Sequence, residues 1–274
     1  MTKKVQTNTP LSKQEIGKPI ENLGIHPKLS ASTDVIVAFW GDIKFVKVSA
    51  GSFLMGSMKY NEIAWDDEKP QHEVEIPYDY WVGRYLITNA QYFRFVEDKI
   101  KAPDDKYGHP VVNVTWQDAQ EFNLWLNQRF ANMLPQGYLF RLLTEAEWEK
   151  AARGTDGREW PWGNNFDNNR CNSSESGKGA TTHIGAYSPR GDSPYGAADM
   201  SGNVWEWTHS LYQSYPYQVN DGRENEVVSE PRVIRGGSFG YGGRRTRTAF
   251  RFSYFPNLSN ESLGFRVAVA PPFP

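Results

Sequence analysis

The chain is 274 residues long, and with 39% hydrophobic and 14% aromatic residues it can bury a substantial core, which argues against disorder along its whole length. A formal net charge of −2 argues against general affinity for nucleic acids or membrane surfaces, and a single cysteine, Cys171, excludes an internal disulfide and a cysteine-rich zinc site. Met1–Pro10 lacks the apolar stretch of a signal peptide and no apolar run of about 18 residues occurs, so we expect a cytoplasmic protein.

The beginning of the chain predicts an extension followed by a strand-rich domain. Residues 1–34 are polar, contain prolines and lack a sustained period, which is typical of a linker. Apolar residues then predict strands from Val35, including Phe45–Val48 and Phe53–Met55, and a second strand region at Glu73–Ile76 and Tyr80–Tyr85. We therefore place one domain over residues 35–274.

Three helices are predicted by their first turns. Each begins with a threonine followed three residues later by Gln, Asp or Glu, the capping-box pattern in which the two side chains satisfy free amides of the first turn. The predicted helices are Thr88–Asp98, a helix from Thr115 to about Phe130, and Thr144–Arg153. Their apolar spacing indicates core packing rather than a cofactor site.

The second half of the chain combines a long loop with short strands. From Pro161 to Tyr195 the residues are mostly Gly, Asn, Ser, Asp and Pro, and a loop of this length in a compact domain is usually functional or pinned by other residues. Strands are predicted again at Arg232–Arg235, Arg245–Ser253 and Gly264–Ala270. Because no alternation of strands and crossover helices occurs, the fold class is α+β with much irregular structure.

Two polar stretches are consistent with bound cations. Asp199 and Glu206 flank a glycine turn, and Asn172 and Glu175 lie in the long loop beside Gly177–Gly179. Hard oxygen donors at this density suit Ca²⁺ or Na⁺. The simpler alternative is that these polar residues only cap turns.

The histidines give little support for a catalytic metal. The five residues are scattered along the chain without helical or hairpin metal spacing, and they are His26, His72, His109, His183 and His209. A site of two histidines and one carboxylate for iron stays open, because metal ligands can converge from distant positions. The sequence also lacks the G-x-S-x-G order of a nucleophile elbow and a phosphate-binding glycine motif.

A series of ordered motifs resembles the formylglycine-generating-enzyme (sulfatase-modifying factor) family. The matching segments are Gly51–Ser57, Tyr85–Asn89, Pro110–Trp116, Arg141–Trp148, Pro161–Gly163, Gly202–Trp207, Arg235–Ser238 and Gly264–Arg266. They span roughly residues 40 to 270. The resemblance implies an α+β, C-type lectin-like fold of the formylglycine-generating-enzyme subtype.

The sequence departs from this family where the chemistry is expected. Members that oxidise a cysteine to formylglycine carry two cysteines shortly after the Gly-Gly-Ser, and these bind copper and the substrate thiol. Here Tyr241 stands at the first cysteine position, and no cysteine is near. Thiolate redox chemistry cannot run on tyrosine and glycine, so we expect no copper and a non-catalytic protein. Trp205 and Ser238 match residues of that active site and are interpreted as framework.

The family's cation sites match this chain better. The resemblance implies one site at Asp199, Gly202, Val204 and Glu206, with Gly202 and Val204 contributing carbonyl oxygens. It implies a second site at Asn172, Ser173, Glu175 and Lys178. The expected structural cation is Ca²⁺ or Na⁺.

The C-terminal stretch also resembles the variable proteins of diversity-generating retroelements, some of which use this fold. In those proteins a reverse transcriptase randomises codons of the ligand-binding face. The candidate variable region is 232–270, framed by Arg235–Ser238, Arg247, Ala249, Arg251, Pro256 and Gly264–Arg266. The resemblance implies these ligand-binding residues: Gly240, Tyr241, Gly242, Arg245, Thr246, Thr248, Phe250, Phe252, Tyr254, Phe255, Leu258 and Ser259.

Period-2 alternation supports two interpretations of this stretch. Arg247, Ala249 and Arg251 would lie on one strand face, and Thr248, Phe250 and Phe252 on the other. Either the aromatic face is core, or internal partners hold the arginines and the aromatics are displayed. The resemblance favours display, as does a composition typical of antibody-like binding surfaces. Alanine at Tyr241, Phe250 and Tyr254 is then expected to spare stability.

The sequence therefore supports three functions. The first is a non-catalytic protein that binds a protein or other macromolecular ligand through its variable surface, without nucleic-acid or membrane partners. The alternative is an iron- or copper-dependent oxidoreductase that uses His72, His183 or His209. A third function is an accessory module whose partner docks on residues 1–33.

Overall fold

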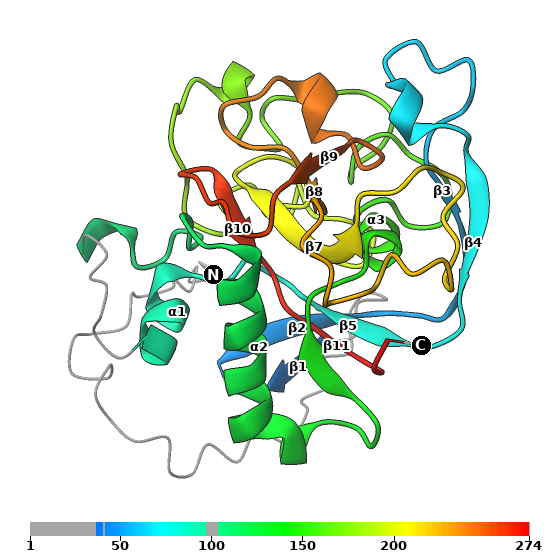
Figure 1. The fold of residues 1–274 in the computed structure, drawn as a ribbon. Coiled ribbons are helices and arrows are strands. Elements are labelled where there is room, and N and C mark those ends of the chain that lie inside the picture. Colours follow the sequence, from blue (N-terminus) through cyan, green and yellow to red (C-terminus); the bar gives the residue numbers. More distant parts are fainter. Residues whose placement is uncertain (1–36, 41, 97–103, 274) are drawn as a thin grey trace, which may run out of the picture.

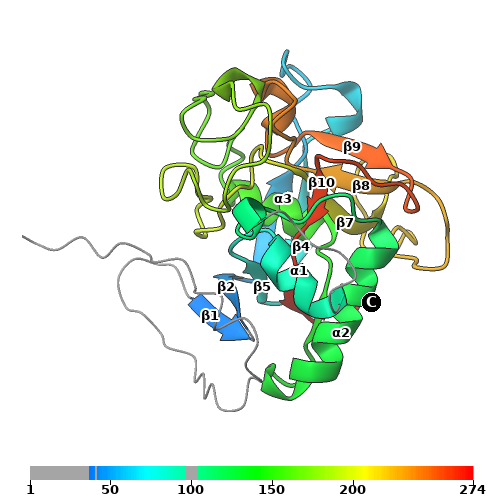
Figure 2. The same cartoon turned by 90° about the vertical axis from the view of Figure 1, so that its left-hand side faces the viewer.

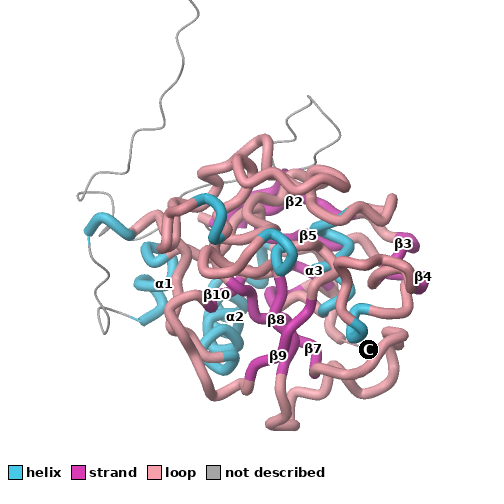
Figure 3. Tube along the Cα trace, turned by 90° about the horizontal axis from the view of Figure 1, so that it is seen from above, coloured by secondary structure: helices cyan, strands magenta, loops and turns pink. Residues whose placement is uncertain are grey.

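The computed structural model describes residues 37–40, 42–96 and 104–273. The predicted N-terminal extension and His26 lie outside the described residues. The upper part of the molecule in Figures 1 and 2 contains a four-stranded sheet, and long loops, pink in Figure 3, surround it. The lower part contains a five-stranded sheet and two α-helices.

The five-stranded sheet has the order β1-β2-β5-β11-β6 and is antiparallel throughout. Its strands are β1 (Val37–Trp40), β2 (Ile43–Val48), β5 (Tyr80–Gly83), β11 (Ala268–Ala270) and β6 (Leu139–Arg141). The last strand of the chain thus pairs with strands from its first half, for example Val269 with Trp81. This pairing closes the domain.

The four-stranded sheet has the order β10-β7-β8-β9. Its strands are β10 (Leu263–Phe265), β7 (Trp205–Leu211), β8 (Arg232–Arg235) and β9 (Arg251–Tyr254). β10 is parallel to β7, and the other two pairings are antiparallel. A separate hairpin joins β3 (Gly51–Met55) and β4 (His72–Ile76).

Three α-helices form as predicted, α1 (Asn89–Val96), α2 (Trp116–Phe130) and α3 (Glu145–Arg153). The capping boxes are present: the amide of Asp118 donates to Thr115 Oγ1 at 3.1 Å, and the amide of Glu147 donates to Thr144 Oγ1 at 3.1 Å. Short 3₁₀ turns occupy η1 (Asp66–Glu68), η2 (Asp104–Lys106), η3 (Ala131–Met133), η4 (Ser174–Ser176) and η5 (Gly243–Thr246). Among the described residues, none of the helices is both long and apolar enough to cross a bilayer.

Two buried clusters form the core. One joins the apolar stripe of α2, which includes Phe122 and Leu126, to Trp205 and Trp207 of β7. The other packs α3 against the β3–β4 hairpin and the strands β2 and β5. All nine residues of α3 are buried although most of them are charged or small.

Hydrogen bonds hold the long loop against the C-terminal segment. The Ser174 amide donates to the Tyr241 carbonyl at 3.0 Å, and the Gly243 amide donates to Glu175 Oε1 at 2.9 Å. Figures 1 and 2 place η4, η5 and the loop between β3 and β4 at the same end of the molecule.

Two predicted strands were wrong in their extent, and one strand was missed. The predicted strand Gly264–Ala270 forms two strands, β10 and β11, which belong to different sheets. Residues 245–250 do not continue β9, because the chain turns through η5 and the strand begins only at Arg251. Strand β7 was missed because polar and apolar residues alternate only over its first four positions, Trp205–Thr208, while all seven of its residues are buried, including Glu206 and His209.

Candidate functional site

The structure divides the twelve predicted ligand-binding residues into nine that reach the surface and three that do not. The accessible residues are Gly240, Tyr241, Gly242, Arg245, Phe252, Tyr254, Phe255, Leu258 and Ser259. Tyr241, Gly242 and Tyr254 are partly buried, whereas the other six are exposed.

Thr246, Thr248 and Phe250 are corrections to the predicted set, because all three are buried. The Thr246 hydroxyl donates to the Gly243 carbonyl at 3.0 Å within η5. The Thr248 hydroxyl donates to the Arg158 carbonyl at 2.9 Å. The Phe250 ring lies 4.7 Å from Trp65 and 5.8 Å from Trp205, centroid to centroid. The assumed strand alternation failed because this stretch is not a strand.

We call the accessible apolar side chains the aromatic ledge and define it as Tyr241, Phe252, Tyr254, Phe255 and Leu258. Phe252, Phe255 and Leu258 are 50%, 52% and 44% exposed. Several large apolar side chains exposed this far within one short segment are a feature of binding surfaces.

Buried tryptophans of β7 support the aromatic ledge from below. The Trp205 ring lies 5.5 Å from Tyr241 and 6.1 Å from Phe252. The Trp207 ring lies 6.0 Å from Tyr254, and its indole nitrogen donates to the Val114 carbonyl at 3.0 Å. Because the supporting rings are fixed, the exposed rings are held in place before any ligand arrives.

The arginines between these aromatics point inward. Arg247 forms a bidentate pair with Glu68, at 2.8 and 2.5 Å, and Arg251 forms one with Glu145, at 2.7 Å for both bonds. These four side chains are buried. Bidentate pairs fix the geometry of both partners. The interpretation that internal partners hold Arg247 and Arg251 is therefore confirmed.

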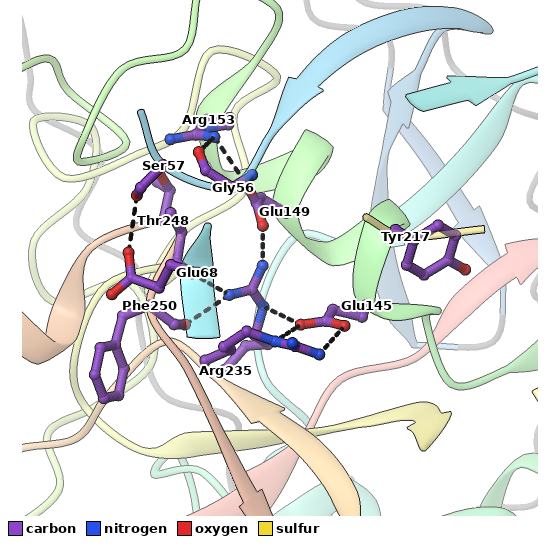
Figure 4. Close-up of polar contacts among 12 residues, drawn as sticks. Gly56, Ser57, Glu68, Glu145, Glu149, Arg153, Tyr217, Arg235, Thr248 and Phe250 are labelled. Carbon is purple, nitrogen blue, oxygen red and sulfur yellow. Dashed lines mark hydrogen bonds and ion pairs between the residues drawn. The ribbon is translucent and has the colours of Figure 1, made fainter. Parts of the chain in front are cut away.

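Arg235 is the centre of this internal frame. Its guanidinium donates to Glu149 and, at 2.7 Å each, to the carbonyls of Ala249 and Phe250 (Figure 4). The contacts join β8 to α3 and to the chain just before β9. The frame therefore sets the backbone position from which the aromatic ledge projects.

Two further arginines lie on the surface beside the aromatic ledge. The Arg244 guanidinium stacks over the Trp65 ring at 4.0 Å, and its Nε donates to the Ile63 carbonyl at 2.8 Å. The Arg245 guanidinium stacks over the Tyr241 ring at 4.8 Å. The sequence did not identify Trp65 as a neighbour of this surface. Its partner Arg244 lies 179 positions further along the chain, and no local pattern connects the two residues.

One side chain of the predicted cation site around β7 is already engaged within the protein. Both carboxylate oxygens of Glu206 accept from Arg266, at 2.6 and 2.7 Å, and one also accepts from the Trp148 indole at 2.9 Å. The Glu206 carboxylate is thus the internal counter-ion of Arg266, and the role of this residue at a cation site stays a prediction. Burial raises the pKa of Asp199 to about 6, although the Gly185 amide donates to its carboxylate at 2.6 Å.

The second predicted cation site has most of its polar atoms engaged within the protein. Asn172 accepts from the Ser176 hydroxyl at 3.0 Å and donates to the Ala180 carbonyl at 2.9 Å. Glu175 holds the Gly243 amide, Ser173 is buried and Lys178 is exposed. Among the described residues, no group of three His, Cys, Asp or Glu side chains lies close enough to hold a metal ion, although Ca²⁺ and Na⁺ also bind carbonyl and amide oxygens. For Asp199, Gly202, Val204 and the Asn172–Lys178 loop, a structural cation stays a prediction.

Two of the described histidines, His72 and His209, lie in separate environments, and the other two lie against each other. His209 lies between Glu224, at 2.7 Å, and Glu226, at 3.0 Å. His72 contacts the Pro70 carbonyl and the Tyr217 amide, both at 2.8 Å. His109 and His183 approach each other, with ring centroids 5.0 Å apart. The three histidines that the oxidoreductase alternative would use, His72, His183 and His209, do not lie next to one another.

The single thiol is unsuited to act as a nucleophile. Cys171 is buried, and burial raises its pKa to about 11. The thiol is therefore protonated at neutral pH, whereas the thiolate is the form that attacks substrates and binds metals.

Comparison with known proteins identifies the family. The model of the "Sulfatase-modifying factor enzyme 1-like domain" matches residues 42–271. The chain is 34% identical over 180 residues to the inactive C-alpha-formylglycine-generating enzyme 2 of Bos taurus, covering 60% of this chain and 51% of that relative. It is 31% identical over 300 residues to the formylglycine-generating enzyme of Thermomonospora curvata, covering 82% and 93%.

A solved structure agrees with the fold. Treponema denticola variable protein 1 superposes with a TM-score of 0.65 at 21% identity, covering 88% of this chain and all of that one. The chain spans about half the length of the bovine relative. The α+β, C-type lectin-like fold of the formylglycine-generating-enzyme subtype is confirmed. The chain thus belongs to the sulfatase-modifying factor enzyme 1-like family.

Proposed function

We propose that this chain is a non-catalytic binding protein that presents the aromatic ledge to a protein or other macromolecular ligand. One observation carries the proposal: half-exposed aromatic rings project from a backbone that buried ion pairs hold in place. Rigid aromatic side chains supply contact area at a low cost in conformational entropy. Aromatic residues are also enriched among the residues that dominate binding energy.

The absence of catalysis is supported by the state of the single cysteine. Cys171 is buried and protonated at neutral pH, and Tyr241 stands at the position of the first cysteine that follows Gly-Gly-Ser in the formylglycine-forming members of the family. One of the matched relatives is named an inactive enzyme. These observations favour a family member that keeps the fold of the enzymes and uses its surface to bind a ligand.

We further propose that the surface is diversified by a retroelement. The accessible residues are interleaved with buried frame residues, so side chains of the aromatic ledge can vary while Arg235, Arg247 and Arg251 keep the backbone fixed. The structural neighbour from Treponema denticola is itself named a variable protein. Sequencing the genomic surroundings tests this: a reverse transcriptase and a near-repeat of the DNA for residues 232–270, differing only at adenines, are expected. Their absence would contradict diversification but not binding.

A selection experiment tests the binding function. A phage-displayed library of random peptides is panned in parallel on the wild-type protein and on the Tyr241→Ala/Phe252→Ala/Tyr254→Ala variant. We expect enrichment on the wild type that the variant loses. Leu124→Ala is the matched control, because Leu124 is 58% exposed on α2 and lies outside the aromatic ledge. Equal enrichment on the wild type and the triple variant would contradict the proposed function.

The oxidoreductase alternative rests on the 31% identity to a formylglycine-generating enzyme. It is tested by metal analysis of the purified protein. Stoichiometric iron or copper that is lost on substituting His183 by Ala would favour the alternative over the binding function. His183 is the best choice because it lies beside a second histidine, His109.

A further inference from the structure

Strand β9 forms one edge of the four-stranded sheet, whose order is β10-β7-β8-β9. Its antiparallel pairing with β8 joins Arg235 to Arg251 at one end and Arg232 to Tyr254 at the other. In such a pair, alternate residues direct their N–H and C=O groups to the partner strand, and the residues between them direct theirs outward. Among the described residues, none pairs with the outer side of β9. This edge therefore presents unpaired main-chain donors and acceptors.

Two other sheet edges are covered by groups of the protein itself. At β6, Asn127 of α2 takes the place of a neighbouring strand: the Phe140 amide donates to Asn127 Oδ1 at 2.8 Å, and Asn127 Nδ2 donates to the Phe140 carbonyl at 2.7 Å. At β10, the Phe265 carbonyl accepts from the Ile87 amide at 3.1 Å. Covering an edge in this way prevents it from pairing with another chain. The outer edge of β9 differs from both because it is left open.

The residues of β9 do not protect its edge either. Lysines, prolines and β-bulges keep many exposed edges from pairing with another strand. Strand β9 reads Arg-Phe-Ser-Tyr, and its register with β8 has no shift. Its one charged side chain, Arg251, is buried and paired with Glu145. The edge therefore stays accessible to another strand.

The two faces of β9 differ in polarity. Phe252 and Tyr254 project on the face of the aromatic ledge, over Trp205 and Trp207, whereas Ser253 projects on the opposite face. A strand added beside β9 would place its side chains alternately next to these two faces. Large apolar side chains would then lie beside the two rings, and polar ones beside Ser253.

We propose that the outer edge of β9 binds an extended segment of a partner protein as a fifth strand of this sheet, and that large apolar side chains alternate with polar ones in that segment. This inference rests on the proposed function and specifies the conformation of the partner. An extended segment fits because its main-chain groups are free to bond outward, whereas those of a helix bond within the helix. Main-chain bonds to β9 supply affinity, and contacts with Phe252 and Tyr254 supply specificity. Because β9 has four residues, it spans about 13 Å and suits a segment of about the same length.

Backbone N-methylation of a bound peptide tests strand addition independently of side chains. The probe is a linear peptide selected on the full chain from the phage-displayed library, and two derivatives carry N-methyl groups on its odd-numbered or on its even-numbered residues. If the peptide adds as a strand, only one of these two sets of amides bonds to β9. We expect the derivative methylated on that set to lose at least about tenfold in affinity, and the other to bind within about twofold of the unmodified peptide.

The outcomes separate this inference from the proposed function. If both derivatives bind as tightly as the unmodified peptide, strand addition is overturned and the proposed function stands. An equal loss in both derivatives would also overturn strand addition, because N-methyl groups in either set disrupt a bound helix. Unchanged affinity of the unmodified peptide for Phe252→Ala/Tyr254→Ala would instead contradict the proposed function.

Hydrogen exchange of the full chain locates the peptide on the molecule. On saturation with the unmodified peptide, at least one amide among Phe252, Ser253 and Tyr254 is expected to exchange at least about tenfold more slowly, because it bonds to the peptide instead of to water. The Phe140 amide is the matched control, since Asn127 already holds it, and its exchange is expected to stay the same. Unchanged exchange at all three residues of β9 would overturn the inference. A dimer of the free chain that the peptide dissociates in sedimentation would also overturn it, because a second copy would then occupy this edge.

Discussion

Charged residues are usually exposed and apolar residues usually buried, but two regions of this molecule show the reverse. They are helix α3 and the segment formed by strand β9 and the loop that follows it. The helix reads Glu-Ala-Glu-Trp-Glu-Lys-Ala-Ala-Arg, and every one of its residues is buried. The segment from Phe252 to Leu258 reads as core, and its apolar side chains Phe252, Phe255 and Leu258 are about half exposed. The two regions are directly linked, because Glu145 of α3 holds Arg251 of β9.

The contrast indicates that the exposed apolar segment depends on the buried charged residues for its position. Buried ion pairs are costly to desolvate and contribute mainly through fixed geometry. Here that geometry fixes the backbone of the segment whose side chains face outward. We expect substitutions in the charged interior to lower the free energy of unfolding. Substitutions in the aromatic ledge are expected to weaken binding and to leave stability nearly unchanged.

The largest effect is expected for Glu145→Gln. The substitution leaves the buried Arg251 guanidinium without its anionic partner, which costs about 3–5 kcal/mol of the free energy of unfolding. Denaturant unfolding of the variant measures this loss. Glu121→Gln, an exposed position on α2, serves as the control and is expected to match wild type. Equal stability of the Glu145 variant would mean that the pair is not required.

Phe250→Ala is expected to have the next largest effect, about 3 kcal/mol, because the ring is buried between Trp65 and Trp205. Chemical denaturation again gives the value. A loss below about 1 kcal/mol would contradict the burial of the Phe250 ring and assign it to the displayed side chains.

A structural cation, if present, is expected to contribute up to about 2.7 kcal/mol at a concentration one hundred times its dissociation constant. Unfolding is compared in Ca²⁺ and in a chelator, for wild type and for Asp199→Asn. We expect Ca²⁺ to stabilise only the wild type, since the variant keeps an acceptor for the Gly185 amide but loses the charge. Identical unfolding curves for the wild type in Ca²⁺ and in chelator would show that Ca²⁺ does not stabilise this protein.

The smallest effect on stability is expected for Phe255→Ala, less than about 1 kcal/mol, because its ring is 52% exposed. Thermal unfolding monitored by tryptophan fluorescence checks this value. A loss comparable with that of Phe250→Ala would show that the aromatic ledge is part of the core.

Much of the fold was predictable because its signals are local. The capping boxes at Thr115 and Thr144 gave the helix starts, and the ordered motifs gave the family. The inward direction of Arg247 and Arg251 followed from the resemblance. Strand β7 was not predictable, because Glu206 and His209 are polar yet buried through partners far away in the chain.

The candidate site was predictable only in part, for the same physical reason. Phe252 and Phe255 were placed correctly, whereas Phe250 was misassigned because strand alternation was assumed beyond the start of β9. The loop carrying Trp65 could not be found, since its contact with Arg244 joins residues 179 positions apart. Long-range packing of this kind leaves no periodic trace in a sequence.

The most direct test measures the affinity of Phe252→Ala/Tyr254→Ala for a library-selected peptide together with its unfolding temperature in the same preparation. We expect at least about a tenfold loss of affinity with the unfolding temperature nearly unchanged. Unchanged affinity, or a loss of binding that only accompanies unfolding, would contradict the claim that the aromatic ledge is the binding surface.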